Sequence, residues 1–214
     1  MQAIKSLIDF ILHIDAHLLA IVSEYGTLTY LILFLIVFGE TGLVVTPFLP
    51  GDSLLFVAGT IAAQGSLNIW LLLTILFVAA IIGDTVNYWI GHYIGPKVFE
   101  NDRFKLINKK YLLKAQDFYE RKGAIVIVIA RFIPIIRTFA PFVAGVSKMN
   151  FRVFIIFNIF GGALWVLTMT LAGFFFGSIP IIKENFSLVT IAIILVSLIP
   201  VIKSIIEMNS KKEK

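Results

Sequence analysis

The hydrophobic pattern of the chain is dominated by two apolar stretches, residues 27–64 and 123–147, that prolines and glycines interrupt. Each stretch is as apolar as a membrane-spanning helix, but a proline inside a helix removes a hydrogen bond and favours a break. The first limb, residues 27–40, would reach only about 21 Å as a helix, against a hydrocarbon core of roughly 30 Å. Each stretch is therefore predicted to be a re-entrant hairpin with two short helical limbs.

Uninterrupted apolar runs follow each predicted hairpin. Residues 68–94 and 150–178 are long enough to cross a bilayer, and the aromatic residues near the ends of the first run are typical of interface anchors. A C-terminal region, residues 185–214, is expected to add one more spanning helix and a lysine-rich tail. The N-terminal residues 1–25 place apolar side chains at helical spacing, which predicts an amphipathic helix in the membrane interface, with a spanning helix as the alternative.

Small and polar residues form two stripes along the C-terminal half of the run at 68–94. The four-residue spacing of one stripe permits close packing of another helix. Its members are Gly83, Asn87, Gly91 and Gly95. The neighbouring polar stripe is expected to make hydrogen bonds between helices, or to form a secondary ligand or proton site. Its members are Asp84, Tyr88 and His92.

The order amphipathic segment, broken hairpin, spanning helix occurs twice, and Phe-Val-Ala-Gly follows the break both times, at 56–59 and 142–145. The basic segment 96–122 and the basic tail are expected on the cytoplasmic side, so that the two hairpins enter from opposite faces. The predicted fold class is an all-α polytopic membrane protein built on an inverted repeat, a design used by transporters. Residues 26–180 would form the transport domain.

Composition narrows the functional classes. With 59% hydrophobic and 14% charged residues among 214, the chain is unlike a soluble domain. The net charge of +5 comes largely from basic residues beside the apolar runs, which indicates the membrane topology and not nucleic-acid binding. Without cysteines, with three scattered histidines and without G-x-S-x-G or H-E-x-x-H motifs, we expect neither an enzyme nor a metal or cofactor site.

Four charges lie inside the two broken stretches, where charge is costly and marks a functional site by default. Arg131 and Arg137 are candidate phosphate-binding residues, because a guanidinium can bond two phosphate oxygens at once. Glu40 and Asp52 are candidate counter-charges that could carry protons once a phosphate displaces them. Purely structural ion pairs are the alternative. The break residues are candidate hinges, namely Gly39, Gly42, Pro47, Pro50 and Gly51 in the first stretch and Pro134 and Pro141 in the second.

Three motifs resemble the DedA family of bacterial membrane proteins, also called the VTT or SNARE-associated domain family, over about residues 25–180. They are Pro-Phe-Leu-Pro-Gly-Asp-Ser at 47–53, Gly83-Asp84 with Tyr88 and Gly91, and Arg131-Phe-Ile-Pro-Ile-Ile-Arg137-Thr-Phe-Ala-Pro141. The resemblance implies that an acidic pair and an arginine pair carry function at Glu40, Asp52, Arg131 and Arg137. It also implies transport of a lipid phosphate, chiefly the flipping of undecaprenyl phosphate across the bacterial cytoplasmic membrane, with dependence on the proton gradient.

Several alternatives stay open at this stage. Within transport they are a phospholipid flippase or scramblase and a proton-coupled cation antiporter, and from another class a non-transporting scaffold or assembly factor. The expected partners are the lipid phosphate, protons and membrane lipids, without nucleic acid, and a homo-oligomer is not excluded. The C-terminus is expected on the cytoplasmic side.

Overall fold

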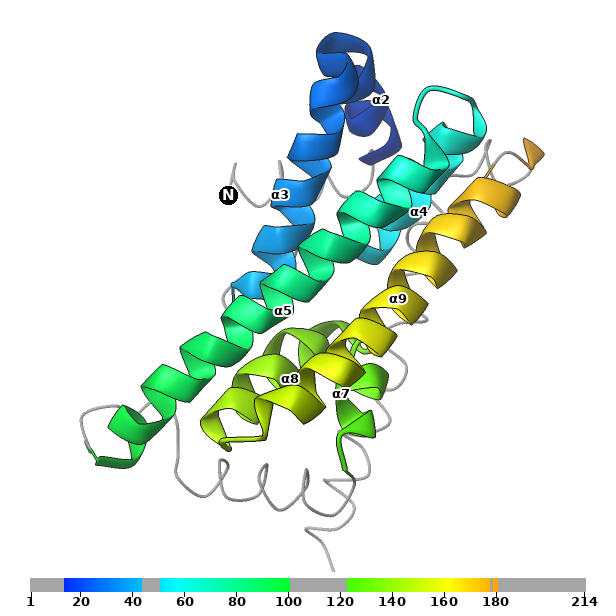
Figure 1. Ribbon diagram of the computed structural model, residues 1–214. Helices are drawn as coiled ribbons and strands as arrows, with labels where there is room; N and C mark the ends of the chain where they lie inside the picture. The colour runs from blue at the N-terminus through cyan, green and yellow to red at the C-terminus, as the bar shows by residue number, and fades with distance from the viewer. Residues whose placement is uncertain (1–13, 44–50, 101–122, 178, 181–214) are drawn as a thin grey trace, which may run out of the picture. The chain divides into compact units, whose positions relative to one another are not determined.

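The computed structural model describes residues 14–43, 51–100, 123–177 and 179–180, and these residues form helices and short connections without a strand. The predicted all-α class is thereby confirmed for this part of the chain. The elements are α2 (Ile14–Tyr25), η1 (Gly26–Leu28), α3 (Thr29–Gly42), α4 (Gly51–Ala63), α5 (Ile69–Glu100), α7 (Ile125–Ala130), α8 (Pro134–Val146) and α9 (Phe151–Phe176) (Figure 1). The expected C-terminal span, most of the basic segment and the first half of the N-terminal helix lie outside the described residues.

Among the described residues, three stretches are long and apolar enough to cross a membrane, namely Ala16–Gly42, Ile69–Ile94 and Phe151–Phe176. The last two agree with the spans predicted at 68–94 and 150–178. The first joins α2, η1 and α3, and the chain turns within it at Gly26, whose φ is +53°. Since α3 itself contains 14 residues, it has the length expected of a short hairpin limb.

Helix α5 extends beyond its predicted end. The span was predicted to end at residue 94, because Pro96 was expected to stop the helix before the basic segment 96–122, but the helix continues through Pro96 to Glu100. A proline has a φ angle that suits a helix, and it removes one hydrogen bond without forbidding the turns that follow. The expectation of a helix end at Pro96 was therefore wrong.

The helices form two compact units, whose boundaries fall inside α3, α5 and α9. The first unit contains residues 1–35, 48–76 and 165–214, and the second contains residues 36–47 and 77–164.

In the first unit, α4 packs closely against the C-terminal half of α9, and all α4 residues from Gly51 to Ala62 are buried. Glycines make this approach possible, because a Cβ at Gly59 would overlap the carbonyl oxygen of Thr170 and one at Gly173 would overlap that of Phe56. The hydroxyl of Thr60 donates to the Gly173 carbonyl at 3.1 Å. Such contacts hold helices together through backbone proximity.

In the second unit, α8 packs against α5 by the same arrangement. A Cβ at Gly145 would overlap the carbonyl oxygen of Tyr88, and a Cβ at Gly91 would overlap that of Phe142. In both units the Phe and the Gly of one Phe-Val-Ala-Gly sequence make these contacts. The repeat read from the sequence thus has matching packing in each unit, while the opposite orientation of the two copies stays a prediction.

Candidate functional site

The second unit contains a helix break between α7 and α8 (Figure 1). Helix α7 ends at Ala130, and Ile133 has an extended backbone with φ −120° and ψ 105° before Pro134 begins α8. A residue that precedes proline favours this extended conformation, so the local sequence accounts for the break. Arg131 follows the last residue of α7, and Arg137 lies in the first turn of α8.

Arg137 forms a buried ion pair with Glu40, its Nη2 donating a hydrogen bond to Oε1 of the carboxylate. Their side chains are 6% and 1% exposed, respectively. Glu40 lies in the last turn of α3, next to the break predicted for the first stretch. One of the pairings expected from the sequence is therefore present.

Arg131 is held by a different set of side chains. Its Nη2 donates to Oδ2 of Asp84 and to Oδ1 of Asn158, and all three residues are buried. Asn158 is itself oriented by α5, because its Nδ2 donates to the Ile81 carbonyl at 3.2 Å. Gly162 leaves room for the guanidinium, since a Cβ at this position would lie 3.2 Å from Nη1 of Arg131. Asp84, for which the sequence suggested a secondary role, is thus a direct partner of Arg131.

Asp52 belongs to the first unit, where the indole Nε1 of Trp165 donates to its Oδ1 at 2.7 Å. Both side chains are buried. Asp52 also lies in the first turn of α4, where the positive end of the helix dipole favours a carboxylate. Asp52 is therefore stabilised by its own helix and by α9.

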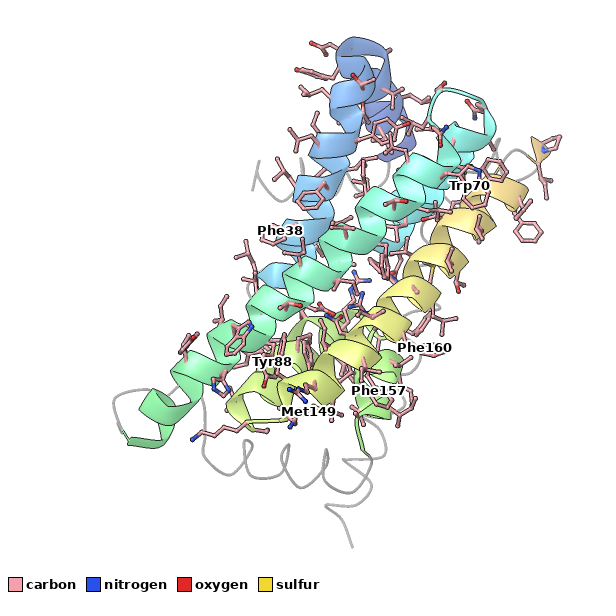
Figure 2. The ribbon with its side chains drawn as sticks, in the orientation of Figure 1. Phe38, Trp70, Tyr88, Met149, Phe157 and Phe160 are labelled. Carbon is pink, nitrogen blue, oxygen red and sulfur yellow. The ribbon has the colours of Figure 1, made fainter. Side chains whose placement is uncertain are left out.

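Tyr88 and His92 have surroundings that indicate packing. The hydroxyl of Tyr88 donates to the Met149 carbonyl, and its ring stacks on Phe154 with centroids 4.5 Å apart (Figure 2). His92 stacks on Tyr88 with centroids 6.0 Å apart. These contacts join the C-terminal part of α5 to the start of α9.

The candidate hinge residues are distributed differently from expectation. Gly39 lies within α3, Gly42 is its last residue and Gly51 is the first residue of α4. Pro47 and Pro50 lie outside the described residues. Pro141 was expected to break the second stretch, but it lies inside α8. The proline costs that helix one hydrogen bond, to the carbonyl of Arg137, while its φ angle still suits the helix.

In the described part of the second unit, two buried ion pairs thus balance their charges, Arg137 with Glu40 and Arg131 with Asp84. Removing one partner of a buried pair leaves an uncompensated charge and typically costs about 3–5 kcal/mol. An anion that engages either guanidinium must therefore compete with a carboxylate that already balances it. This arrangement is suited to exchanging one anionic partner for another.

The sequence alone assigned no role to Asn158 or to Trp165. Asn158 carries a signal in the sequence, since it is a carboxamide within the apolar stretch from Val153 to Val166. Polar groups inside a membrane helix generally find hydrogen-bond partners on neighbouring helices. No comparable signal marked Trp165 as the donor to Asp52.

Comparisons with known proteins agree with this architecture. The family model described as the VTT domain matches residues 49–175. Over 208 residues the chain is 53% identical to Protein DedA of Escherichia coli (strain K12), covering 96% of this chain and 95% of that protein. It is 34% identical over 181 residues to the inner membrane protein YqjA of the same strain, covering 85% of this chain and 82% of YqjA.

A third relative is an uncharacterized membrane protein of Mycobacterium tuberculosis (strain ATCC 25618 / H37Rv), which is 43% identical over 172 residues, or 79% of this chain and 75% of that protein. No solved structure matches the chain. The domain match covers more than half of the chain, and the relatives align over most of their length. The chain therefore belongs to the DedA family of membrane proteins and carries the VTT domain of that family.

Proposed function

We propose that this membrane protein transports an anionic lipid, with undecaprenyl phosphate as its substrate. The observation that carries the proposal is the pair of buried arginines on either side of the α7–α8 break, each held by a carboxylate from another helix. Family membership is consistent with a transporter. The arginines supply the charge that a lipid phosphate requires.

Arg137 is the proposed first contact for the phosphate. Its planar guanidinium can donate two parallel hydrogen bonds to phosphate oxygens, which a lysine ammonium cannot reproduce. In the structure, the Arg137 guanidinium donates a hydrogen bond to the Glu40 carboxylate, so a phosphate that binds Arg137 must replace this carboxylate. Arg131 provides a second positive charge, held in place by Asp84 and Asn158.

Displaced from Arg137, Glu40 is the proposed proton carrier. A carboxylate that loses its counter-charge away from water is more stable in its protonated form. Moving one elementary charge against a potential of 100 mV costs about 2.3 kcal/mol, so a co-transported proton would reduce the work of moving a phosphate. Asp52 is proposed as a second counter-charge in the first unit.

The lipid tail is proposed to stay in the bilayer while the headgroup crosses. Residues on α9 such as Ile156 and Phe160 are more than half exposed, as expected for side chains that face lipid. Figure 2 labels Phe160 on α9. By the positive-inside rule, the basic tail is proposed to lie on the cytoplasmic side of the membrane.

Flipping of a polyprenyl phosphate in proteoliposomes tests the proposal. The native protein is expected to flip the lipid, whereas Arg137→Ala and Arg137→Lys should each lose at least about 100-fold in rate, since lysine cannot form the bidentate contact. The matched control is Thr74→Val, because the exposed Thr74 hydroxyl donates only to the Trp70 carbonyl of its own helix in the described structure.

Undiminished flipping by both Arg137 variants would refute the assignment. Cation flux in the absence of any lipid phosphate would favour an antiporter, in which Glu40 and Asp84 are ion ligands. Full activity of Arg137→Lys together with Arg131→Lys in cells, without flipping in vesicles, would favour a scaffold.

A further inference from the structure

Asn87 connects the two segments that carry the Glu40–Arg137 ion pair. It is fully buried on α5, and its Nδ2 donates to the Thr41 carbonyl at 3.0 Å and to the Thr138 carbonyl at 2.8 Å. Both partners are acceptors, which identifies the nitrogen end of the amide. Since a carboxamide nitrogen carries two N–H groups, these two bonds use its full donor capacity.

The two accepting carbonyls belong to residues next to the ion pair in the chain. Thr41 follows Glu40 at the end of α3, and Thr138 follows Arg137 in α8. One side chain on α5 therefore holds the backbone on both sides of the pair. As long as both hydrogen bonds exist, the separation of these backbone segments is restricted.

Helix α5 is shaped to receive both segments around Asn87. Four residues earlier, a Cβ at Gly83 would overlap the hydroxyl of Thr41. Four residues later, a Cβ at Gly91 would overlap the carbonyl oxygen of Phe142 in α8. Along α5, the predicted stripe of small residues thus lets α3 pack closely before Asn87, at Gly83, and lets α8 pack closely after it, at Gly91.

Only the nitrogen end of the Asn87 amide has hydrogen-bond partners among the described residues. Its Oδ1 is buried and accepts no hydrogen bond from the described residues. A buried acceptor without a donor is unfavourable, whereas the two hydrogen bonds from Nδ2 satisfy carbonyls of buried residues and are favourable. The two N–H donors of the amide are therefore what favours asparagine at position 87.

We propose that Asn87 is a positioning residue that sets how readily the Glu40–Arg137 pair opens for the anionic headgroup, an inference that rests on the proposed function. With both carbonyls held, Glu40 stays opposed to Arg137 and competes with the phosphate. For the two segments to separate, one of the Asn87 hydrogen bonds must break. After release of the lipid, the same bonds restore the closed pair.

The test measures the rate of polyprenyl phosphate flipping in proteoliposomes against lipid concentration for Asn87→Leu. The half-saturating concentration should fall about threefold, because the phosphate no longer separates a held pair, and the maximal rate should fall about tenfold, because the pair re-forms poorly. A purely structural defect would lower the maximal rate through loss of folded protein and leave the half-saturating concentration unchanged. That second pattern would overturn the proposal.

A second variant covers the case in which Asn87→Leu does not fold. Asn87→Asp keeps the shape of the side chain, but whether ionised or protonated it can donate to at most one of the two carbonyls and cannot bridge them, so the same changes in both quantities are expected. Thr74→Val on the same helix is the matched control and should leave both quantities as in the native protein. Native kinetics in Asn87→Asp would contradict a role for the two donors.

A readout independent of transport separates this inference from the proposed function. The rate at which phenylglyoxal modifies Arg137 is followed by peptide mass analysis in detergent, without any lipid phosphate. Asn87→Leu or Asn87→Asp should raise this rate about threefold, since the protecting pair opens more often. If the native protein flips no lipid phosphate, the proposed function fails, but this comparison still decides the role of Asn87: equal modification rates would refute it.

Discussion

The guanidinium of Arg131 donates a hydrogen bond to the carboxylate of Asp84, and both side chains are buried in the second unit. Asp84 lies on α5 and Arg131 directly follows α7, so the two residues are separated in sequence by the basic segment, yet the pair leaves neither charge uncompensated. Asn87, three residues after Asp84, donates to the backbone beside Arg137. Asp84 and Asn87, on one turn of α5, therefore contact Arg131 and the backbone next to Arg137, respectively.

Loss of the Asp84 charge should destabilise the protein strongly. Asp84→Asn leaves Arg131 without its carboxylate and should lower the free energy of unfolding in detergent by about 3–5 kcal/mol. The double variant Asp84→Asn with Arg131→Gln should recover much of this loss, because it removes the unbalanced charge. Equal loss in the single and the double variant would show that the pair contributes through packing alone.

A methyl group beside Arg131 should disturb its position. Gly162→Ala would place a Cβ 2.6 Å from Cδ1 of Ile81 and 3.2 Å from Nη1 of Arg131, so that both side chains must shift. We expect a loss of about 1–3 kcal/mol in the free energy of unfolding. Gly39→Ala is the matched control, since nothing lies within 4 Å of its added Cβ and alanine favours the helix, and it should be neutral or stabilising.

The matching glycine contacts of the two units should be equally sensitive to substitution. Gly59→Ala in the first unit and Gly145→Ala in the second both force a Cβ against a backbone carbonyl, which cannot rotate away as a side chain can. Each should cost at least about 1–3 kcal/mol in chemical unfolding experiments. A large loss for one and none for the other would argue against equivalent packing.

The hydrogen bond between Trp165 and Asp52 should contribute measurably to stability. Trp165→Phe keeps an aromatic ring but removes the donor, so a buried carboxylate loses one hydrogen bond, at a cost of about 1–3 kcal/mol. In the background Asp52→Asn the same substitution should cost less, because a neutral amide oxygen depends less on the donor. Thermal unfolding of the four proteins measures the difference, and strictly additive effects would refute the coupling.

The proton dependence of transport should reside in Glu40. Native flipping is expected to respond to the pH difference across the vesicle membrane at fixed potential, whereas Glu40→Gln should flip at a rate independent of that difference. The measurement compares both proteins at several internal and external pH values. A full response in Glu40→Gln would assign the proton to another group, with Asp52→Asn as the next variant to examine.

The partners of the arginines show where sequence reasoning reached its limit. Charge and the positions of the breaks indicated Glu40 and Asp52 as counter-charges of the two arginines, but not which acid pairs with which arginine. A guanidinium on a long side chain can reach acids on several helices, and the packing of α5, α7 and α9 selects among them, so Asp84 could not be predicted as the partner of Arg131. Pro141 was misread for a similar reason, since a proline disfavours a helix locally but the packed surface of α8 can offset the lost hydrogen bond.

The sequence by itself determined the all-helical membrane architecture, the short limbs and the spans, because apolar run length and the conformational limits of the residues around proline are local properties. It also identified the charged residues and the small-residue stripe of α5. Only the tertiary structure decided that Asp84 and Asn158 hold Arg131, that Trp165 holds Asp52 and that Asn87 spans the two segments of the Glu40–Arg137 pair. These choices depend on which helices approach closely, and glycine contacts between residues far apart in the chain set those approaches.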